Sequence, residues 1–229
     1  MTVENKLITT EPIAETTDKS LGAVWEAVKT AFGQRDCIGY WRYPLFSQVG
    51  EVRKEPDILV VDKELGLIII EIAPVAIEQI IAGEGDKWQL VNADTISPSP
   101  AERVQMQIQT LLGYCDRETA IAGKITGRAL IALPHISPEQ WQQKTLPTAN
   151  PIIFQNQVNS NIIEAIQNSP AIVTGEPLDE EGWHILKAVI SGTTILRKSA
   201  ENAVSANGKN RAAIIANLQY CLYDIEIQK

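Results

Sequence analysis

The sequence predicts an α/β fold in which helices flank a mixed central sheet of about four or five strands. Two apolar runs rich in β-branched residues, Ile58–Val61 and Leu67–Ile70, flank a short turn and predict a β-hairpin. Apolar residues recur at helical spacing over Leu21–Phe32, and Ala101–Tyr114 follows a proline-rich segment as the second main helix. Strands and helices that alternate along one chain in this way indicate an α/β domain.

Shorter segments complete the expected fold. Residues 1–19 are polar and rich in threonine, and we expect an extended lead-in there. The further expected strands are Cys37–Val49, which also contains a turn, and Ile77–Ile81, Asp86–Val91, Arg128–Leu133 and Ile152–Phe154. The further expected helices are Asn161–Asn168, Asp179–Ser191 and Arg211–Leu222, with a loop or short helix over 137–150.

The chain of 229 residues suits one domain, or one domain with an appendage. We expect an α/β core over residues 1–134 and a helical annex over 135–196 that continues the core. From residue 197 the composition shifts to small and polar residues, which is typical of a linker. Residues 197–229 are therefore expected to form a linker followed by the last helix.

Composition and charge argue against several classes of protein. No apolar run approaches the ~20 residues that a membrane-spanning helix needs, and the N-terminus lacks the basic and apolar regions of a signal peptide. The three cysteines are far apart and predict no disulfide framework, so we expect a cytoplasmic protein without a membrane partner. A net charge of −8 argues against tight autonomous binding of nucleic acid, but it leaves room for a local basic rim or a larger protein that holds the nucleic acid.

Common catalytic motifs are missing from the sequence. His135 and His184 stand alone, without the HExxH spacing of a histidine zinc site. The sequence has no G-x-S-x-G nucleophile elbow and no G-x-x-x-x-G-K-[ST] loop, so we do not expect this chain to bind ATP as P-loop proteins do.

A pair of carboxylates at the predicted hairpin is the main candidate for chemistry. If the turn centres near Glu64, antiparallel pairing places Asp57 opposite Glu71, with Cβ atoms roughly 5 Å apart. Two carboxylates at that separation repel each other unless a cation or a proton lies between them, which favours a metal site. The alternative is structural: Asp57 is a turn residue after Pro56, and Glu71 is a solvent-exposed carboxylate at the end of a strand.

The order of these elements resembles a known family. A helix glutamate, a strand that begins with Pro-Asp, and a hairpin into an apolar strand that ends in glutamate are similar to the PD-(D/E)xK nucleases, and more narrowly to their nuclease-related domain (NERD) branch. The resemblance spans about Leu21 to Leu133 and implies a restriction-endonuclease-like core. The positions that match the family pattern are Glu26, Asp57, Gly66, Glu71, Trp88 and Pro100.

The resemblance implies a role for each matching carboxylate. Asp57 and Glu71 would ligate Mg²⁺, which prefers oxygen ligands, and Glu26 would complete the catalytic set through a water molecule. The ion would polarise a DNA phosphodiester and lower the pKa of the attacking water. The implied activity is Mg²⁺-dependent hydrolysis of DNA. The side chains expected to contact the nucleic acid are Arg53, Lys54, Gln105 and Gln109.

The sequence departs from the family pattern where the family has a lysine two residues after the second carboxylate. This chain has Ala73 there, and the family pattern places none of Lys54, Lys63 and Lys87 in the site. Arg103 stands near the position where the branch has a glutamine. Three alternatives stay open: an active or lapsed nuclease, a non-catalytic module that positions DNA or a partner for a helicase, and an α/β domain without a metal.

The C-terminus carries a second, shorter resemblance. Leu222–Gln228 is similar to the segment that precedes the ATPase in bacterial superfamily I DNA helicases with an N-terminal nuclease-related domain. The implied partners are DNA and a helicase motor domain, in the same chain or in another one.

Overall fold

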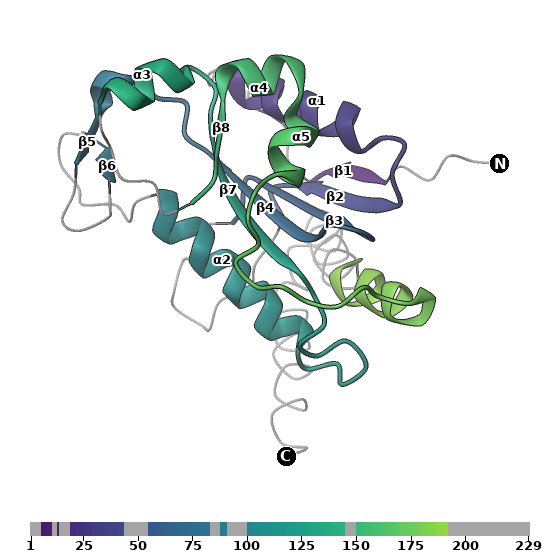
Figure 1. The fold of residues 1–229 in the computed structure, drawn as a ribbon. Helices are drawn as coiled ribbons and strands as arrows, with labels where there is room; N and C mark the ends of the chain where they lie inside the picture. Colours follow the sequence, from purple (N-terminus) through teal and green to yellow (C-terminus); the bar gives the residue numbers. More distant parts are fainter. Residues whose placement is uncertain are drawn as a thin grey trace, which may run out of the picture. The chain divides into compact units, whose positions relative to one another are not determined.

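Six strands form one mixed sheet in the computed structural model of the chain, which describes residues 6–10, 13, 19–43, 55–82, 88–90, 100–144 and 150–191 (Figure 1). These strands are β1 Leu7–Thr9, β2 Cys37–Trp41, β3 Ile58–Asp62, β4 Gly66–Ile72, β7 Gly127–Leu133 and β8 Ile152–Phe154. They lie side by side in the order β1-β2-β3-β4-β7-β8. The β2–β3 and β3–β4 pairs are antiparallel, whereas the β1–β2, β4–β7 and β7–β8 pairs are parallel.

The remaining elements do not belong to this sheet. A separate antiparallel pair, β5 Ile80–Ala82 and β6 Trp88–Leu90, follows the short 3₁₀ helix η1 Ile77–Gln79. The helices are α1 Lys19–Phe32, α2 Pro100–Cys115, α3 Pro138–Gln143, α4 Gln155–Ser160 and α5 Ile162–Gln167, and residues 180–191 are also helical. Figure 1 shows α2 on one side of the sheet and α1, α4 and α5 on the other.

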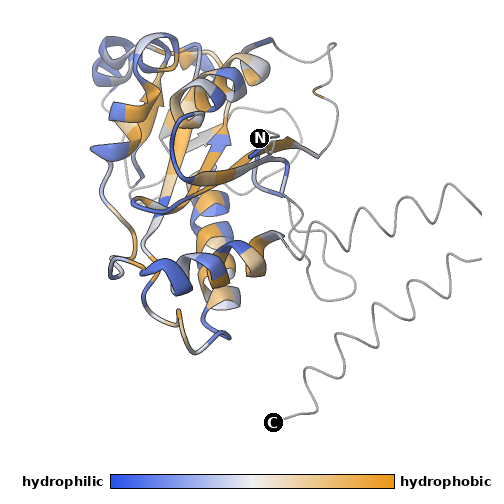
Figure 2. Ribbon diagram, turned by 90° about the vertical axis from the view of Figure 1, so that its right-hand side faces the viewer, coloured by the Kyte–Doolittle hydropathy of each residue, from blue (hydrophilic) through white to orange (hydrophobic). Residues whose placement is uncertain are grey.

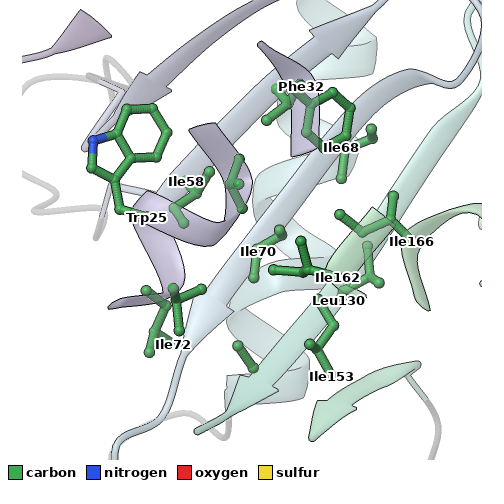
Figure 3. Packing of buried hydrophobic residues seen from close by; sticks show 14 of the residues in the cluster. Trp25, Phe32, Ile58, Ile68, Ile70, Ile72, Leu130, Ile153, Ile162 and Ile166 are labelled. Carbon is green, nitrogen blue, oxygen red and sulfur yellow. The ribbon is translucent and has the colours of Figure 1, made fainter. Parts of the chain in front are cut away.

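One face of the sheet packs against α1, α4 and α5 (Figure 3). The buried side of α1 presents Trp25, Val28 and Phe32, whose spacing places them on a single helix face. They belong to one cluster with alternate residues of β3 and β4, including Ile58 and Ile70. The period of two along each strand sends these side chains toward α1 and sends their neighbours to the opposite face.

The opposite face packs against α2, whose buried side carries Val104, Ile108 and Leu111. Close approach to this helix explains Gly127 at the start of β7, because a Cβ there would lie 2.8 Å from a methyl carbon of Leu112. Both faces of β4 are therefore covered. All residues of β3 and β4 are buried, and both sequences are largely continuous apolar runs. Figure 2 shows this concentration of hydrophobic residues in the strands.

The expected α/β fold with a mixed central sheet flanked by helices is confirmed, but the sheet has six strands. Leu7–Thr9 was expected in an extended lead-in, and it pairs with β2 as a parallel edge strand. The expected strand Ile152–Phe154 is confirmed as β8, and it pairs with β7 in the central sheet although it lies within the expected helical annex. Part of residues 135–196 thus extends the central sheet itself.

Residues 1–187 form one compact unit, and residues 188–229 belong to a second one. The expected linker, the expected helix Arg211–Leu222 and the helicase-like segment Leu222–Gln228 lie outside the described residues. Across the described ranges, no helix combines the length and the apolar character that crossing a membrane requires.

Candidate functional site: buried carboxylates of the central hairpin

The β3–β4 hairpin has the register expected from the sequence. Ile58 pairs with Ile70, so Asp57, one position before β3, lies opposite Glu71. Asp57 is 2% exposed and Glu71 is completely buried. The alternative in which Glu71 is a solvent-exposed carboxylate at a strand end is therefore wrong. Two acidic groups are held next to each other inside the protein, and each needs a partner that offsets the loss of hydration.

Arg42, which directly follows β2, is the partner of Asp57. Its Nη1 lies 2.8 Å from Oδ1 of Asp57, and the other carboxylate oxygen accepts a hydrogen bond from the Ile72 N–H at 2.7 Å. The Arg42 N–H also donates to the main-chain oxygen of Asp57 at 2.8 Å. Both carboxylate oxygens of Asp57 thus have donors.

Arg103, in the first turn of α2, is the partner of Glu71. Its Nε and Nη2 lie 2.9 Å and 2.8 Å from the same oxygen, Oε1 of Glu71. The Arg103 side chain is 14% exposed, so this ion pair is largely shielded from water. Charge-assisted hydrogen bonds of this kind are among the stronger polar contacts in proteins.

Asp62, at the end of β3, repeats the pattern. Arg35 donates to its two oxygens, from Nε at 2.7 Å and from Nη2 at 2.9 Å. The same carboxylate accepts the N–H groups of Glu64 and Leu65 and so shapes the hairpin turn. The hydrogen bond with Asp62 raises the pKa of Arg35. We call the pairs Arg42–Asp57, Arg35–Asp62 and Arg103–Glu71 the hairpin ion pairs.

Glu26, Gln105 and Gln109 are not among the residues that contact these carboxylates in the described part of the chain. Glu26 is on α1, which packs on the other face of the sheet from α2, and its carboxylate pairs with Lys29 at the surface. Gln105 and Gln109 are exposed on α2. The glutamine of α2 that faces inward is Gln107, which is 5% exposed and lies one turn after Arg103.

The lysines considered for the site are not brought to it in the described part of the chain. Lys63 lies in the hairpin turn and pairs with Glu180. Arg53, Lys54 and Lys87 lie outside the described residues. Ala73, at the position of the family lysine, is buried, and its N–H donates to the main-chain oxygen of Ala132 at 2.9 Å.

The residues present do not fit Mg²⁺ in this arrangement. An ion shared by Asp57 and Glu71 needs free carboxylate oxygens, but both oxygens of Asp57 and Oε1 of Glu71 accept hydrogen bonds. Two guanidinium groups beside them would also repel a divalent cation. Within the described ranges, no group of at least three His, Cys, Asp or Glu side chains has a metal-binding arrangement. The geometry instead supplies a positive charge for each buried carboxylate.

Arg128, on β7, contrasts with these paired arginines. Its Nε and Nη1 are buried, and no hydrogen-bond acceptor for them lies among the described residues. Burial lowers the pKa of Arg128. Buried donor groups without an acceptor are costly, so Arg128 serves as a comparison for the paired arginines.

Glu180 and Trp183, in the first turn of the helical segment that follows residue 179, contact the same end of the hairpin. Lys63 pairs with Glu180, and this contact lowers the pKa of the Glu180 carboxyl group. The Trp183 indole donates to Oδ2 of Asp36 at 3.1 Å, next to Arg35. Residues at the hairpin turn therefore form an ion pair with Arg35, through Asp62, and also contact the first turn of this helical segment through Lys63.

Comparisons of the chain with protein-family models, with curated proteins and with solved structures found no match.

Proposed function

We propose that this chain is a nuclease-like domain of the helicase-associated type in which the carboxylate pair is structural. It acts as a non-catalytic module that positions a protein partner, or DNA held by that partner. The observation that carries this proposal is the pairing of Asp57 with Arg42 and of Glu71 with Arg103, at the site where the resemblance implies a metal. The net charge of −8 favours a protein that supplies the grip on DNA.

The order of elements supports the nuclease-like part of the proposal. The resemblance implies a helix, the carboxylate hairpin, a hairpin with a tryptophan and a helix that starts at proline. The chain has α1, β3–β4, β5–β6 with Trp88, and α2 starting at Pro100. This agreement supports a restriction-endonuclease-like core.

One observation favours the second candidate, Mg²⁺-dependent hydrolysis of DNA. Asp57 and Glu71 lie opposite each other, as a metal-binding pair requires. Against this candidate, Ala73 has neither a charge nor a hydrogen-bond donor in its side chain, so it cannot stabilise the charge that develops on the phosphate.

Plasmid nicking in Mn²⁺ distinguishes the two candidates. We expect no cleavage by the wild type or by Asp57→Asn. Cleavage by the wild type that Asp57→Asn abolishes would show an active nuclease and contradict the proposal. Cleavage gained by Ala73→Lys would show that the site is a lapsed one, because residue 73, directly after β4, is the position where the resembled family has its lysine.

Binding is tested by fluorescence anisotropy with labelled single-stranded DNA at low salt. We expect at most weak binding by the isolated chain, and a clear decrease as salt is added. Tight binding that salt does not weaken would contradict the proposal that a partner supplies the grip.

A further inference from the structure

Two of the hairpin ion pairs break local preferences of the chain. Arg42 has φ +57°, in the left-handed region, where no other non-glycine residue among the described ones is found. Such a conformation costs on the order of 1–3 kcal/mol for a residue with a side chain. Arg103 lies in the first turn of α2, where the positive end of the helix dipole disfavours a cation by about 0.3–1 kcal/mol.

Both departures occur at an arginine that reaches a buried carboxylate. Arg42 contacts Asp57 through its main chain and its side chain, and Arg103 places two donors on Glu71. A local conflict that persists in a fold indicates a compensating tertiary interaction. The compensation here is the neutralisation of two carboxylates that are almost fully buried.

The three arginines come from three different segments. Arg35 lies between α1 and β2, Arg42 follows β2, and Arg103 lies on α2. Their carboxylate partners all belong to, or directly precede, the β3–β4 hairpin. The hairpin ion pairs therefore fix the hairpin to its neighbouring strand and to the helix on one face of the sheet.

From this we infer that the guanidinium groups of Arg42 and Arg103 neutralise Asp57 and Glu71 in place of a metal ion. Arg103 is the residue whose presence excludes a metal ion from this pair of carboxylates. The acidic pair is then a metal-independent element of the fold, which joins α2 to the hairpin. This inference goes beyond the proposed function, because it concerns the stability of the fold. It is tested by unfolding measurements and not by DNA cleavage.

A double-mutant cycle tests the inference through the free energy of unfolding in urea. Glu71→Gln removes the charge with little change of shape, and Arg103→Met keeps most of the apolar stem. Each single variant removes one partner of this buried ion pair, so we expect the unfolding equilibrium constant to rise about 100-fold in each. The double variant removes both groups and is expected to be at least about tenfold more stable than the sum of the single effects implies.

The control is the pair Lys63–Glu180, which is also an ion pair of the hairpin but has an exposed carboxylate. Its cycle, with Lys63→Met and Glu180→Gln, is expected to show a coupling of less than about fivefold. If a single variant at Glu71 or Arg103 does not fold, recovery of folding in the double variant takes the place of the coupling. A double variant that also fails to fold would contradict the inference.

The same unfolding curves are measured in Mg²⁺ and in EDTA. We expect equal midpoints for the wild type, because no metal contributes to its stability. Additive effects at Glu71 and Arg103 would overturn the inference. So would a wild type that Mg²⁺ stabilises, if Glu71→Gln abolishes that stabilisation.

Discussion

Arg42 contacts Asp57 twice, through its main-chain N–H to the Asp57 carbonyl oxygen and through Nη1 to Oδ1, each at 2.8 Å. The residue that makes both contacts has φ +57°. Its guanidinium carbon also lies 5.5 Å from the centre of the Trp41 ring, within the range of a cation–π contact. The residue that follows β2 thus contacts the buried Asp57 through both its main chain and its side chain.

Two substitutions at Arg42 separate the strain from the ion pair. Arg42→Gly and Arg42→Ala both remove the guanidinium, so both are expected to be less stable than the wild type. Glycine adopts positive φ without the steric cost that alanine has, so the glycine variant is expected to be more stable than the alanine variant by about 1 kcal/mol. Urea unfolding measures the difference. Equal stabilities would show that residue 42 is not held in the left-handed conformation.

Substitution of Arg128 is expected to stabilise the protein, whereas substitution of the paired Arg103 is expected to destabilise it. Arg128→Met removes a guanidinium whose buried Nε and Nη1 have no acceptor among the described residues. We expect the free energy of unfolding to rise by about 1–3 kcal/mol, since an unsatisfied buried polar group is lost and the apolar stem is kept. Thermal unfolding beside Arg103→Met, which should be destabilised, checks the contrast. A loss of stability in Arg128→Met would point to a role that the described contacts do not show.

The hairpin turn depends on Gly66, which has φ +82° and lies against β7. A Cβ at this position would lie 2.1 Å from the main-chain oxygen of Thr126, so Gly66→Ala requires the backbone to move. We expect a loss of more than about 2 kcal/mol in the free energy of unfolding. Gly113→Ala in α2 is the matched control, because a Cβ there meets nothing within 4 Å and alanine favours the helix. A Gly66 variant as stable as this control would contradict the hairpin geometry.

The buried cysteines are expected to make the protein less stable at alkaline pH. Burial raises the pKa of Cys37 to about 11 and that of Cys115 to about 12. In the unfolded chain a thiol ionises near pH ~8.5. The unfolded state therefore releases protons first, and the free energy of unfolding is expected to fall as pH rises from that value toward 11.

Ellman's reagent at pH ~8, near the pKa of an unfolded thiol, provides a direct measurement on a Cys221→Ser variant, which leaves the two described thiols. We expect them to react only as fast as the protein unfolds, because they are buried and protonated. Immediate reaction of both thiols in the native state would contradict this environment.

The sequence predicts the hairpin well because its signals are local. Ile58–Val61 and Leu67–Ile70 fall within the observed strands, and the turn between them leads to the expected register. The predicted helices Leu21–Phe32 and Ala101–Tyr114 lie within α1 and α2 for the same reason. By contrast, β1 has only three residues and is stabilised by pairing with β2 about 30 positions away, which no local pattern reveals.

The site is harder to predict, since the partners of its carboxylates come from distant segments. Asp57 and Glu71 were identified as neighbours, but the pattern did not show which cation accompanies them. Gln105 and Gln109 are predicted because the resembled family has a glutamine near the start of this helix. The helical period of α2 instead turns Gln107 and Arg103 inward. The sequence offers one local sign of a tertiary partner for Arg103, which is a cation in the first turn of a helix that starts at a proline.

Calorimetric titration of Mn²⁺ into the wild type, Arg103→Gln and Asp57→Asn tests most directly whether arginine or metal neutralises this site. We predict no saturable binding by the wild type, and binding gained by Arg103→Gln, in which Oε1 of Glu71 loses its charged partner. Stoichiometric binding by the wild type that Asp57→Asn abolishes would contradict the account, because it would place a metal between the carboxylates that Arg42 and Arg103 contact.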